Sequence, residues 1–345
     1  MHNDTSAPDR SSSPRPRSPS PSPPRPQTAE HPRGRGSSVV EQLTILAARL
    51  TDRDRRILRL VHQHRCFTTH QLAAIFFDSA DRAEHRLRQL TQERALERFR
   101  PLLDYGEGSA PFYYVLGPAG AAVLAGEKAT DVRHLEPAYR REKVLALAHS
   151  EHLAHTVGVN GFFCDLIAFA RQHHPTSADN GPPGVLGVLG AALTAWWSEW
   201  RCHARWDRLV RPDGYGRWHH DGREIDFFVE YDRGTEPLDR LVAKLSGYER
   251  LAIGSQLWTP ILFWVLTPGR EANLRQALTR DPRWRTAAFV IATACAALGR
   301  GPAEAAWLPL GEASPRRRLI DLAPGREPQA HHMGAASRAP ASSSA

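Results

Sequence analysis

The chain has 345 residues, and its 45 Lys and Arg against 37 Asp and Glu give a formal charge of +8. A basic balance favours anionic partners such as nucleic acid, but it carries no information about the fold. At roughly 100 to 200 residues per domain, this length predicts two domains. The apolar content of 41% is sufficient for packed cores.

Several classes of protein are excluded by pattern. No apolar run reaches the roughly 18 residues that cross a bilayer, and no apolar segment follows the N-terminal charges as in a secretory signal. The chain has no phosphate-binding loop, GxGxxG or GxSxG motif, so nucleotide hydrolysis, dinucleotide binding and serine-hydrolase chemistry have no support. The four cysteines (Cys66, Cys164, Cys202 and Cys295) lie far apart without a CxxC pair, which disfavours disulfides and zinc. We expect a soluble, cytoplasmic protein with no membrane partner.

Both ends of the sequence have the composition of disordered tails. Residues 1–40 contain nine Pro and nine Ser and no Phe, Trp or Tyr, and residues 323–345 are similarly poor in large apolar side chains. Such segments cannot bury enough apolar surface to offset the entropy lost on ordering. Between the tails, the hydrophobic periodicity changes near residue 126. We therefore expect one module over 41–126 and a second over 138–310.

The first module is predicted to consist of three helices followed by a hairpin. Thr51-Asp52, then Thr68 or Thr69, then Ser79 or Asp81 are helix N-cap residues, each followed by apolar residues at helical spacing. Two strand patterns follow, at 95–103 and 111–117, joined by a turn that contains two glycines. This is the element order of a winged helix-turn-helix.

In a helix-turn-helix, the second helix of the pair lies in the major groove of DNA, where Arg and Gln contact base edges. Two alternatives remain open, because the charged face of a helix is often merely solvated and winged helices also bind proteins. The DNA-binding interpretation is favoured, with double-stranded DNA as the partner. It assigns Arg82, Arg86, Arg88 and Gln89 to the helix, and Arg98 and Arg100 to the wing.

The second module follows the order α-β-β-β-α-β, which predicts a mixed β-sheet flanked by helices in an α+β or α/β fold. A single long helix is expected over 140–173, ended by Pro175, and a helix is expected from Pro237. The strands are expected at 193–201, 209–216, 223–232 and 259–267, and a further helix over 271–280 and a strand near 287–293 complete the module.

Carboxylates gather on one face of the strand predicted at 223–232. Because side chains alternate along a strand, Asp226, Phe228, Glu230 and Asp232 share one face. Asp213 belongs to the neighbouring strand, where pairing brings it toward Glu230. Clustered carboxylate oxygens are the ligands that Mg²⁺ and Mn²⁺ prefer, and without a cation they repel one another. Such a metal ion, with a nearby lysine, supports phosphodiester hydrolysis.

These segments resemble a known family. The run RPDG at 211–214, the run REIDFFVEYDRGTEPLDRLVAKLSGYERL at 223–251, and the upstream HSEHLAHTVGVNGFF and WWSEWR are similar to the actinobacterial plasmid replication-relaxation family. The resemblance covers most of residues 51–280. It implies a role in plasmid replication, relaxation or transfer, and a C-terminal part similar to the PD-(D/E)xK restriction-endonuclease-like fold. By this resemblance, Asp213 matches the Asp of the PD element, Glu230 the acid of (D/E)xK, and Glu151 the helical acid of that fold.

The sequence departs from the endonuclease motif at one position. Where the motif has a lysine two residues after its acid, this chain has Asp232. Lys244, on the following helix, is the candidate replacement, and only Lys128, Lys143 and Lys244 are lysines, so 45 − 3 = 42 basic residues are arginine. Lysine offers a compact ammonium with an adjustable pKa, which arginine does not. The alternative is that Lys244 lies there by chance.

Three functions are consistent with these patterns. The first is a DNA-binding protein of the replication-relaxation type, and the second is a metal-dependent endonuclease or nickase that uses Asp213, Glu230 and Lys244, with Asp213, Glu230 and Glu151 as metal ligands. The third is an adaptor that binds other plasmid replication or transfer proteins. Adjacent arginines can instead neutralise the carboxylates, which would leave an inactive nuclease-like domain.

Overall fold

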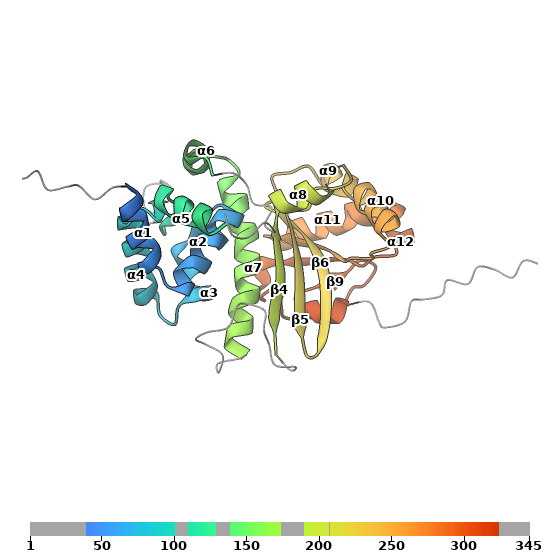
Figure 1. Cartoon of the computed structure of the whole chain (residues 1–345). Coiled ribbons are helices and arrows are strands. Elements are labelled where there is room, and N and C mark those ends of the chain that lie inside the picture. The colour runs from blue at the N-terminus through green and yellow to red at the C-terminus, as the bar shows by residue number, and fades with distance from the viewer. Residues whose placement is uncertain (1–38, 101–109, 129–138, 174–189, 207, 324–345) are drawn as a thin grey trace, which may run out of the picture.

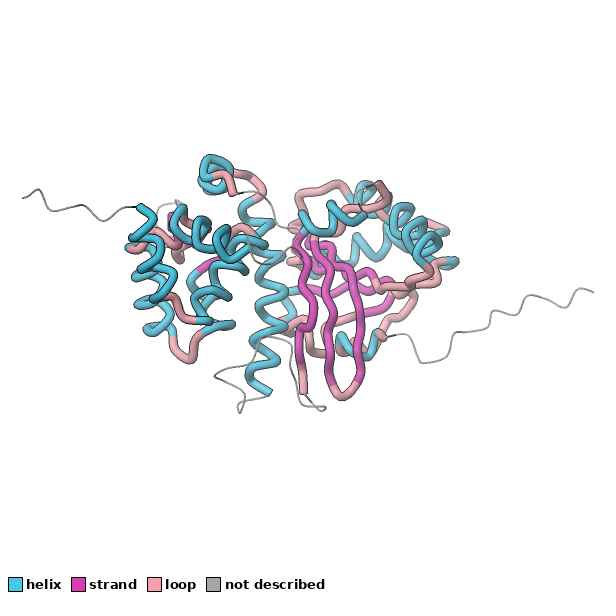
Figure 2. The backbone as a smooth tube through the Cα atoms, in the orientation of Figure 1, coloured by secondary structure: helices cyan, strands magenta, loops and turns pink. Residues whose placement is uncertain are grey.

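A computed structural model describes residues 39–100, 110–128, 139–173, 190–206 and 208–323. The two terminal tails, apart from residues 39, 40 and 323, lie outside the described residues, as do most of the predicted wing turn and the Gly-Pro loop at 181–184. The described chain forms a helical module and a sheet module with the α7 helix between them (Figure 1). Figure 2 shows the same division, with the long strands gathered on one side. The predicted fold class, an α+β protein with a mixed sheet, is confirmed.

The helical module has the predicted order of helices and hairpin, with additional elements. The strand β1 pairs with β3, so the sheet of this module has three strands in the order β1-β3-β2. The helices α1 and α5 were not expected from the sequence. The elements are α1 (Val39–Arg49), α2 (Asp52–His64), β1 (Phe67–Thr68), α3 (Thr69–Phe76), α4 (Ala80–Gln92), β2 (Leu96–Phe99), β3 (Tyr113–Leu116) and α5 (Pro118–Lys128).

The three expected helices begin at capped residues. Thr51 and Asp54 form a reciprocal capping box at α2, and Thr68 forms one with Gln71 at α3. The Ser79 side chain accepts from the backbone N–H of Arg82 at the start of α4. Each cap satisfies backbone donors that the first helical turn leaves unpaired.

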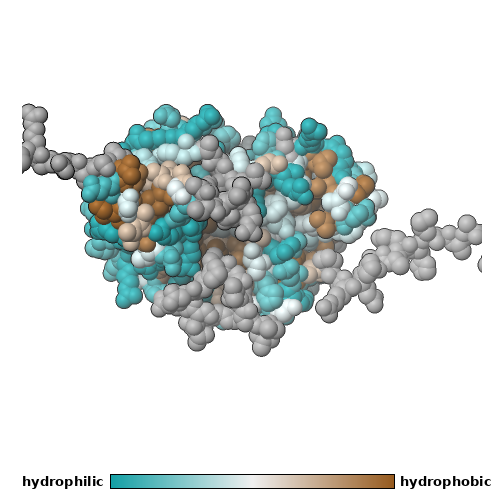
Figure 3. All heavy atoms as spheres, in the orientation of Figure 1, coloured by the Kyte–Doolittle hydropathy of each residue, from teal (hydrophilic) through white to brown (hydrophobic). Residues whose placement is uncertain are grey.

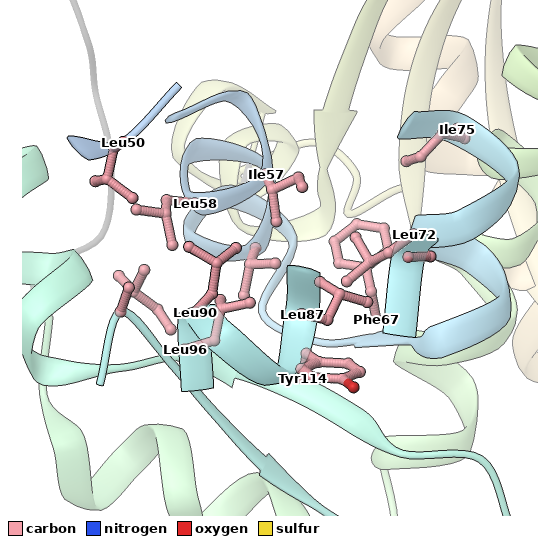
Figure 4. Packing of buried hydrophobic residues seen from close by; sticks show 14 of the residues in the cluster. Leu50, Ile57, Leu58, Phe67, Leu72, Ile75, Leu87, Leu90, Leu96 and Tyr114 are labelled. Carbon is pink, nitrogen blue, oxygen red and sulfur yellow. The ribbon is translucent and has the colours of Figure 1, made fainter. Parts of the chain in front are cut away.

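Buried apolar side chains from these helices meet in one core. Leu58 of α2, Leu72 of α3, and Leu87 and Leu90 of α4 point toward one another, with Phe67 of β1 beside them (Figure 4). In contrast, α1 leaves Val40 and Ile45 exposed, and Figure 3 shows a hydrophobic patch at the N-terminal end of the described chain.

The second module is a six-stranded sheet in the order β4-β5-β6-β7-β8-β9. The strands β4, β5 and β6 are antiparallel, β6, β7 and β8 are parallel, and β9 is antiparallel to β8. The elements are α6 (Arg141–Ala146), α7 (Leu153–His173), β4 (Ala192–Ser198), α8 (Glu199–Trp206), β5 (Gly214–His220), β6 (Arg223–Asp232), α9 (Leu238–Ala243), α10 (Leu245–Ser255), β7 (Ile261–Val265), α11 (Pro268–Arg280), α12 (Arg283–Thr286), β8 (Ile291–Cys295) and β9 (Leu308–Pro309).

The α7 helix belongs to both modules. Its Phe162 and Phe163 join the core under the sheet, whereas its Cys164 joins the core of the helical module. The buried amide of Asn160 donates to the backbone carbonyls of His64 (3.0 Å), the last residue of α2, and of Cys66 (2.7 Å), just before β1. These contacts fix the helical module against α7.

Among the described helices, α7 is long and apolar enough, by length and composition, to cross a membrane. Its apolar side chains, however, pack against α3 on one side and against the sheet on the other. Only Ala154, Asp165, Gln172 and His173 are exposed. The apolar composition of α7 therefore matches a helix that is covered on two faces.

Four predicted boundaries are wrong, for local reasons. The expected long helix over 140–173 breaks at Ser150, which is extended and whose hydroxyl accepts from the backbone N–H of His152. The first sheet strand ends at Ser198, because Cys202 and Trp206 have the four-residue spacing of a helix face and α8 begins at Glu199. The strand expected at 209–216 begins only at Gly214, after Pro212, which has no N–H to donate. The helix after Pro237 is divided into α9 and α10 at Lys244.

A close approach between α7 and β6 requires a glycine. A Cβ atom placed on Gly158 would lie 2.3 Å from the Tyr231 ring of β6. Glycine in a helix interior costs about 1 kcal/mol relative to alanine. The contact between α7 and the sheet explains why that cost is accepted at this position.

Asn160→Ala tests the connection between the modules. The carbonyl of Cys66 would lose its side-chain donor in a buried place, so we expect the free energy of unfolding to fall by about 2 kcal/mol. Urea denaturation measures the change. Asn273→Ala, on the exposed side of α11, is the control and should change stability by less than about 0.5 kcal/mol. Equal effects of the two substitutions would contradict this role of Asn160.

Candidate functional site

Glu230 lies near the C-terminal end of β6, and its carboxylate is fully buried. Its Oε2 accepts from the Lys244 ammonium at 2.5 Å, and its Oε1 accepts from the Tyr248 hydroxyl at 2.5 Å. Burial raises the pKa of Glu230 to about 7, the Lys244 charge acts in the opposite direction, and the Asp213 charge adds to the rise. The carboxylate that the sequence singles out is therefore held by a lysine and a tyrosine.

Asp213 lies immediately before β5 and faces α7. Its Oδ2 accepts from the backbone N–H of Tyr231 at 2.7 Å, and its Oδ1 lies 3.3 Å from Nε2 of His155. Burial acts to raise the pKa of Asp213, but the hydrogen bond from His155 and the Lys244 charge outweigh it and lower the pKa. For His155, burial opposes protonation, and the hydrogen bond and charge of Asp213 raise the pKa.

Lys244 and Tyr248 reach Glu230 from consecutive turns of the α9–α10 segment. Their four-residue spacing places both side chains on one face of the helix, toward β6. Burial acts to lower the pKa of Lys244, but the carboxylates of Glu230 and Asp213 outweigh it and raise the pKa. The structure thus brings together Asp213, Glu230 and Lys244, as the sequence pattern suggests.

Two members of this cluster were missed by sequence reasoning. Tyr248 could have been found from its helical spacing to Lys244. His155 belongs to a histidine triplet with His149 and His152, which are both exposed, whereas His155 alone reaches Asp213. No local pattern distinguishes it from the other two.

The donors of this cluster do not fit a divalent metal ion. Both oxygens of Glu230 accept from protein donors, and both oxygens of Asp213 face donors as well. Glu151, the third expected ligand, is exposed in the turn before α7. Within the described part of the chain, no group of three or more His, Cys, Asp or Glu side chains is arranged to hold a metal ion. The expected Mg²⁺ or Mn²⁺ site is therefore not formed by these residues as placed.

The remaining acids of β6 have other partners. Asp226 pairs with Arg217 across β5 at 2.7 Å, near the exposed end of the strand. Asp232 is buried and accepts from two nitrogens of Arg270 on α11, at 2.6 and 3.3 Å. The acidic residue that replaces the motif lysine at position 232 is thus part of a separate ion pair.

The residues expected to contact DNA divide into two groups. Arg82 and Arg88 of α4 are exposed. Arg86 instead donates from two nitrogens to the buried Asp54 of α2, at 2.9 and 2.6 Å, and also to Gln89. The structure therefore places Arg86 and Gln89 in a network that joins α4 to α2.

The other two residues expected to contact DNA lie at the end of β2 and just after it. The guanidinium carbons of Arg98 and Arg100 lie 3.9 and 4.0 Å from the centre of the Phe112 ring. Stacking on an aromatic face holds a guanidinium in place while its edge donors stay available. The adjacent tryptophans Trp196 and Trp197 pack inside the protein, where Trp196 stacks on Phe163 and Trp197 on Trp206.

Lys244→Met tests the buried ion pair. The substitution leaves the Glu230 carboxylate without its cation, and we expect the free energy of unfolding to fall by about 2 kcal/mol. This is below the roughly 3–5 kcal/mol of a fully buried pair, because Lys244 is 25% exposed and Glu230 can take up a proton. The double variant Glu230→Gln with Lys244→Met should be less destabilised than Lys244→Met alone. Urea denaturation measures both, with Lys143→Met, an exposed lysine, as control.

The pH dependence of stability tests the burial of Glu230. Its pKa rises from 4.5 to about 7 on folding, so between these values the folded state binds a proton that the unfolded state releases. Stability conferred by this group therefore falls as the pH rises from about 4.5 to about 7. The unfolding free energy of the wild type minus that of Glu230→Gln should decrease across this window in urea titrations. An increase would mean that Lys244 keeps Glu230 ionised throughout.

Comparison of the chain with protein families gives one result. The family model described as replication-relaxation matches residues 58–262, from the middle of α2 to the start of β7. Comparison with curated proteins and with solved structures finds no match. The family match covers more than half of the chain and includes both modules and the Asp213, Glu230 and Lys244 cluster. The chain therefore belongs to the replication-relaxation family.

Proposed function

We propose that the protein binds double-stranded DNA through α4 and the wing, and that it acts in this way in plasmid replication, relaxation or transfer in the cytoplasm. The observation that carries the proposal is a pair of exposed arginines on α4. Arg82 and Arg88 are exposed, and neither side chain pairs with any residue that the structure describes. Family membership supports the same direction.

The position of α4 suits DNA reading. It is the second helix of the α3–α4 pair, the one that lies in the major groove in helix-turn-helix proteins. Arg82 is in its first turns, where side chains of such helices contact base edges, and an arginine can donate two hydrogen bonds to guanine. The α4 helix thus presents donors where a duplex offers acceptors.

The support beneath α4 is rigid. Asp54 caps α2 and accepts the two-nitrogen contact from Arg86, so one carboxylate holds both helices. The first-turn N–H of α4 is satisfied by Ser79. Arg86 therefore serves DNA binding by orienting α4, and Arg82 and Arg88 serve it by direct contact.

The wing would supply backbone contacts beside the helix. Arg98 and Arg100 stack on the same Phe112 ring, and the guanidinium edge of Arg98 can donate to phosphate oxygens. For the second module, we favour a role in holding DNA or a partner protein of the replication or transfer system. The carboxylates of Glu230 and Asp213 already accept hydrogen bonds from other groups of the protein.

Arg82→Gln with Arg88→Gln tests this function. We expect binding to a fluorescein-labelled 30-base-pair duplex to weaken at least about tenfold, because each lost base or phosphate contact removes about 1 kcal/mol or more. Fluorescence anisotropy in 50–200 mM salt measures the affinity. Arg280→Gln with Arg285→Gln removes the same charge from exposed positions near α12 and should leave binding unchanged. The proposal fails if the wild type binds no duplex at 50 mM salt.

A further inference from the structure

We propose that α8 and the turn that follows it form a second DNA-contacting surface, which binds backbone phosphates. This inference rests on the proposed function, because it adds a second contact for the same ligand. The surface, called the α8 surface below, consists of Arg201, Arg205 and Arg208. All three residues are exposed.

The sequence of α8 separates an apolar face from a cationic one. Cys202 is fully buried, and Trp206, four residues later, packs on Trp197, Tyr215 and Phe228. Arg201 and Arg205 have the same four-residue spacing and therefore share the outward side. Arg208 extends this side into the following turn.

The α8 surface is held in one arrangement. Aromatic contacts fix Trp206 on the sheet, and the backbone N–H groups of Leu209 and Val210 both donate to the Trp206 carbonyl, at 2.8 and 3.0 Å. The guanidinium carbon of Arg201 lies 4.4 Å from the centre of the Trp197 ring. A surface fixed before binding loses less entropy when it contacts a phosphate backbone.

The positive charge of the α8 surface is not cancelled by partners. Neither Arg205 nor Arg208 forms an ion pair with a residue within the described ranges, and Arg201 contacts the ring of Trp197. The acid of the helix, Glu199, is near His155 and Cys202, because its charge acts on the pKa of both. The Glu199 side chain itself is exposed at the start of α8.

The negative charges beneath α8 are also neutralised. Glu230 is paired with Lys244, and Asp213 with His155. A phosphate that approaches α8 therefore meets arginines without a net anionic field from the cluster below. The buried pair of Glu230 and Lys244 therefore also allows the sheet module to approach DNA.

Arginines at this spacing suit a phosphate backbone. Each guanidinium can donate two hydrogen bonds to one phosphate, and such contacts carry no sequence information. We therefore expect the α8 surface to add affinity and salt dependence, whereas α4 reads the bases. Burial lowers the pKa of His64 in α2, and the charge of Arg201 lowers it further. The α8 surface therefore begins where the two modules meet.

Arg205→Gln with Arg208→Gln tests the α8 surface, with the duplex and the salt range used for α4. Each phosphate contact contributes about −0.9 to the slope of log affinity against log salt concentration. We therefore expect the slope of this variant to be less negative by about 2. The matched variants are Arg82→Gln with Arg88→Gln on α4, and Arg280→Gln with Arg285→Gln as charge control. Urea denaturation checks that all variants are folded.

The outcomes separate this inference from the proposed function. If the α8 variant keeps the slope of the charge control while the α4 variant binds weakly, the α8 surface is wrong and the proposed function stands. If the α8 variant loses slope while the α4 variant behaves as the control, the α8 surface stands and the assignment of α4 fails. A wild type that binds no DNA overturns both.

Discussion

The α7 helix supplies residues to the hydrophobic cores on both of its sides, and the arrangement of the two modules depends on this. Phe162 and Phe163 lie under the sheet, and Asn160 hydrogen-bonds the chain between α2 and β1. A helix covered on two faces cannot carry the single apolar stripe of a surface helix, which explains its apolar composition. Because His155 is in the first turn of α7, the same packing also brings an imidazole to Asp213.

Buried acids in this protein follow one rule, with an informative exception. Asp54, Asp232 and Glu271 each accept from two nitrogens of one arginine, namely Arg86, Arg270 and Arg316. Glu230 instead divides its oxygens between Lys244 and Tyr248. A guanidinium donates to both oxygens of a carboxylate, whereas the Lys244 ammonium donates to one oxygen of Glu230 and the Tyr248 hydroxyl to the other. In a chain with 42 arginines and three lysines, Lys244 lies where one oxygen of Glu230 accepts from a cation and the other from a hydroxyl.

Local sequence patterns predict many of the helices and strands of this fold. The starts of three helices are predicted by the N-cap residues Thr51, Thr68 and Ser79. The alternation of side chains along 223–232 predicts which face of β6 carries Glu230. The rarity of lysine was enough to nominate Lys244. What could not be predicted depends on contacts between distant segments. In the sequence, Arg86 cannot be distinguished from the other arginines of its helix, because its partner Asp54 lies on α2. His155 cannot be distinguished from the neighbouring histidines, because its partner Asp213 lies just before β5.

The distribution of arginines connects the stability of this protein with its proposed activity. The formal charge of +8 is spread over the chain, since residues 41–126 contain 12 Arg against 10 acidic residues. Bulk charge of this size gives only weak, nonspecific attraction, so affinity must come from the position of individual guanidinium groups. Arginines that face buried acids are fixed as structural partners and cannot also neutralise phosphate without breaking those pairs. Arg82, Arg88, Arg205 and Arg208 are exposed on capped or anchored helices and combine a free charge with a fixed position. Ion pairing inside the protein therefore determines which of its many arginines remain available for the DNA binding that we propose.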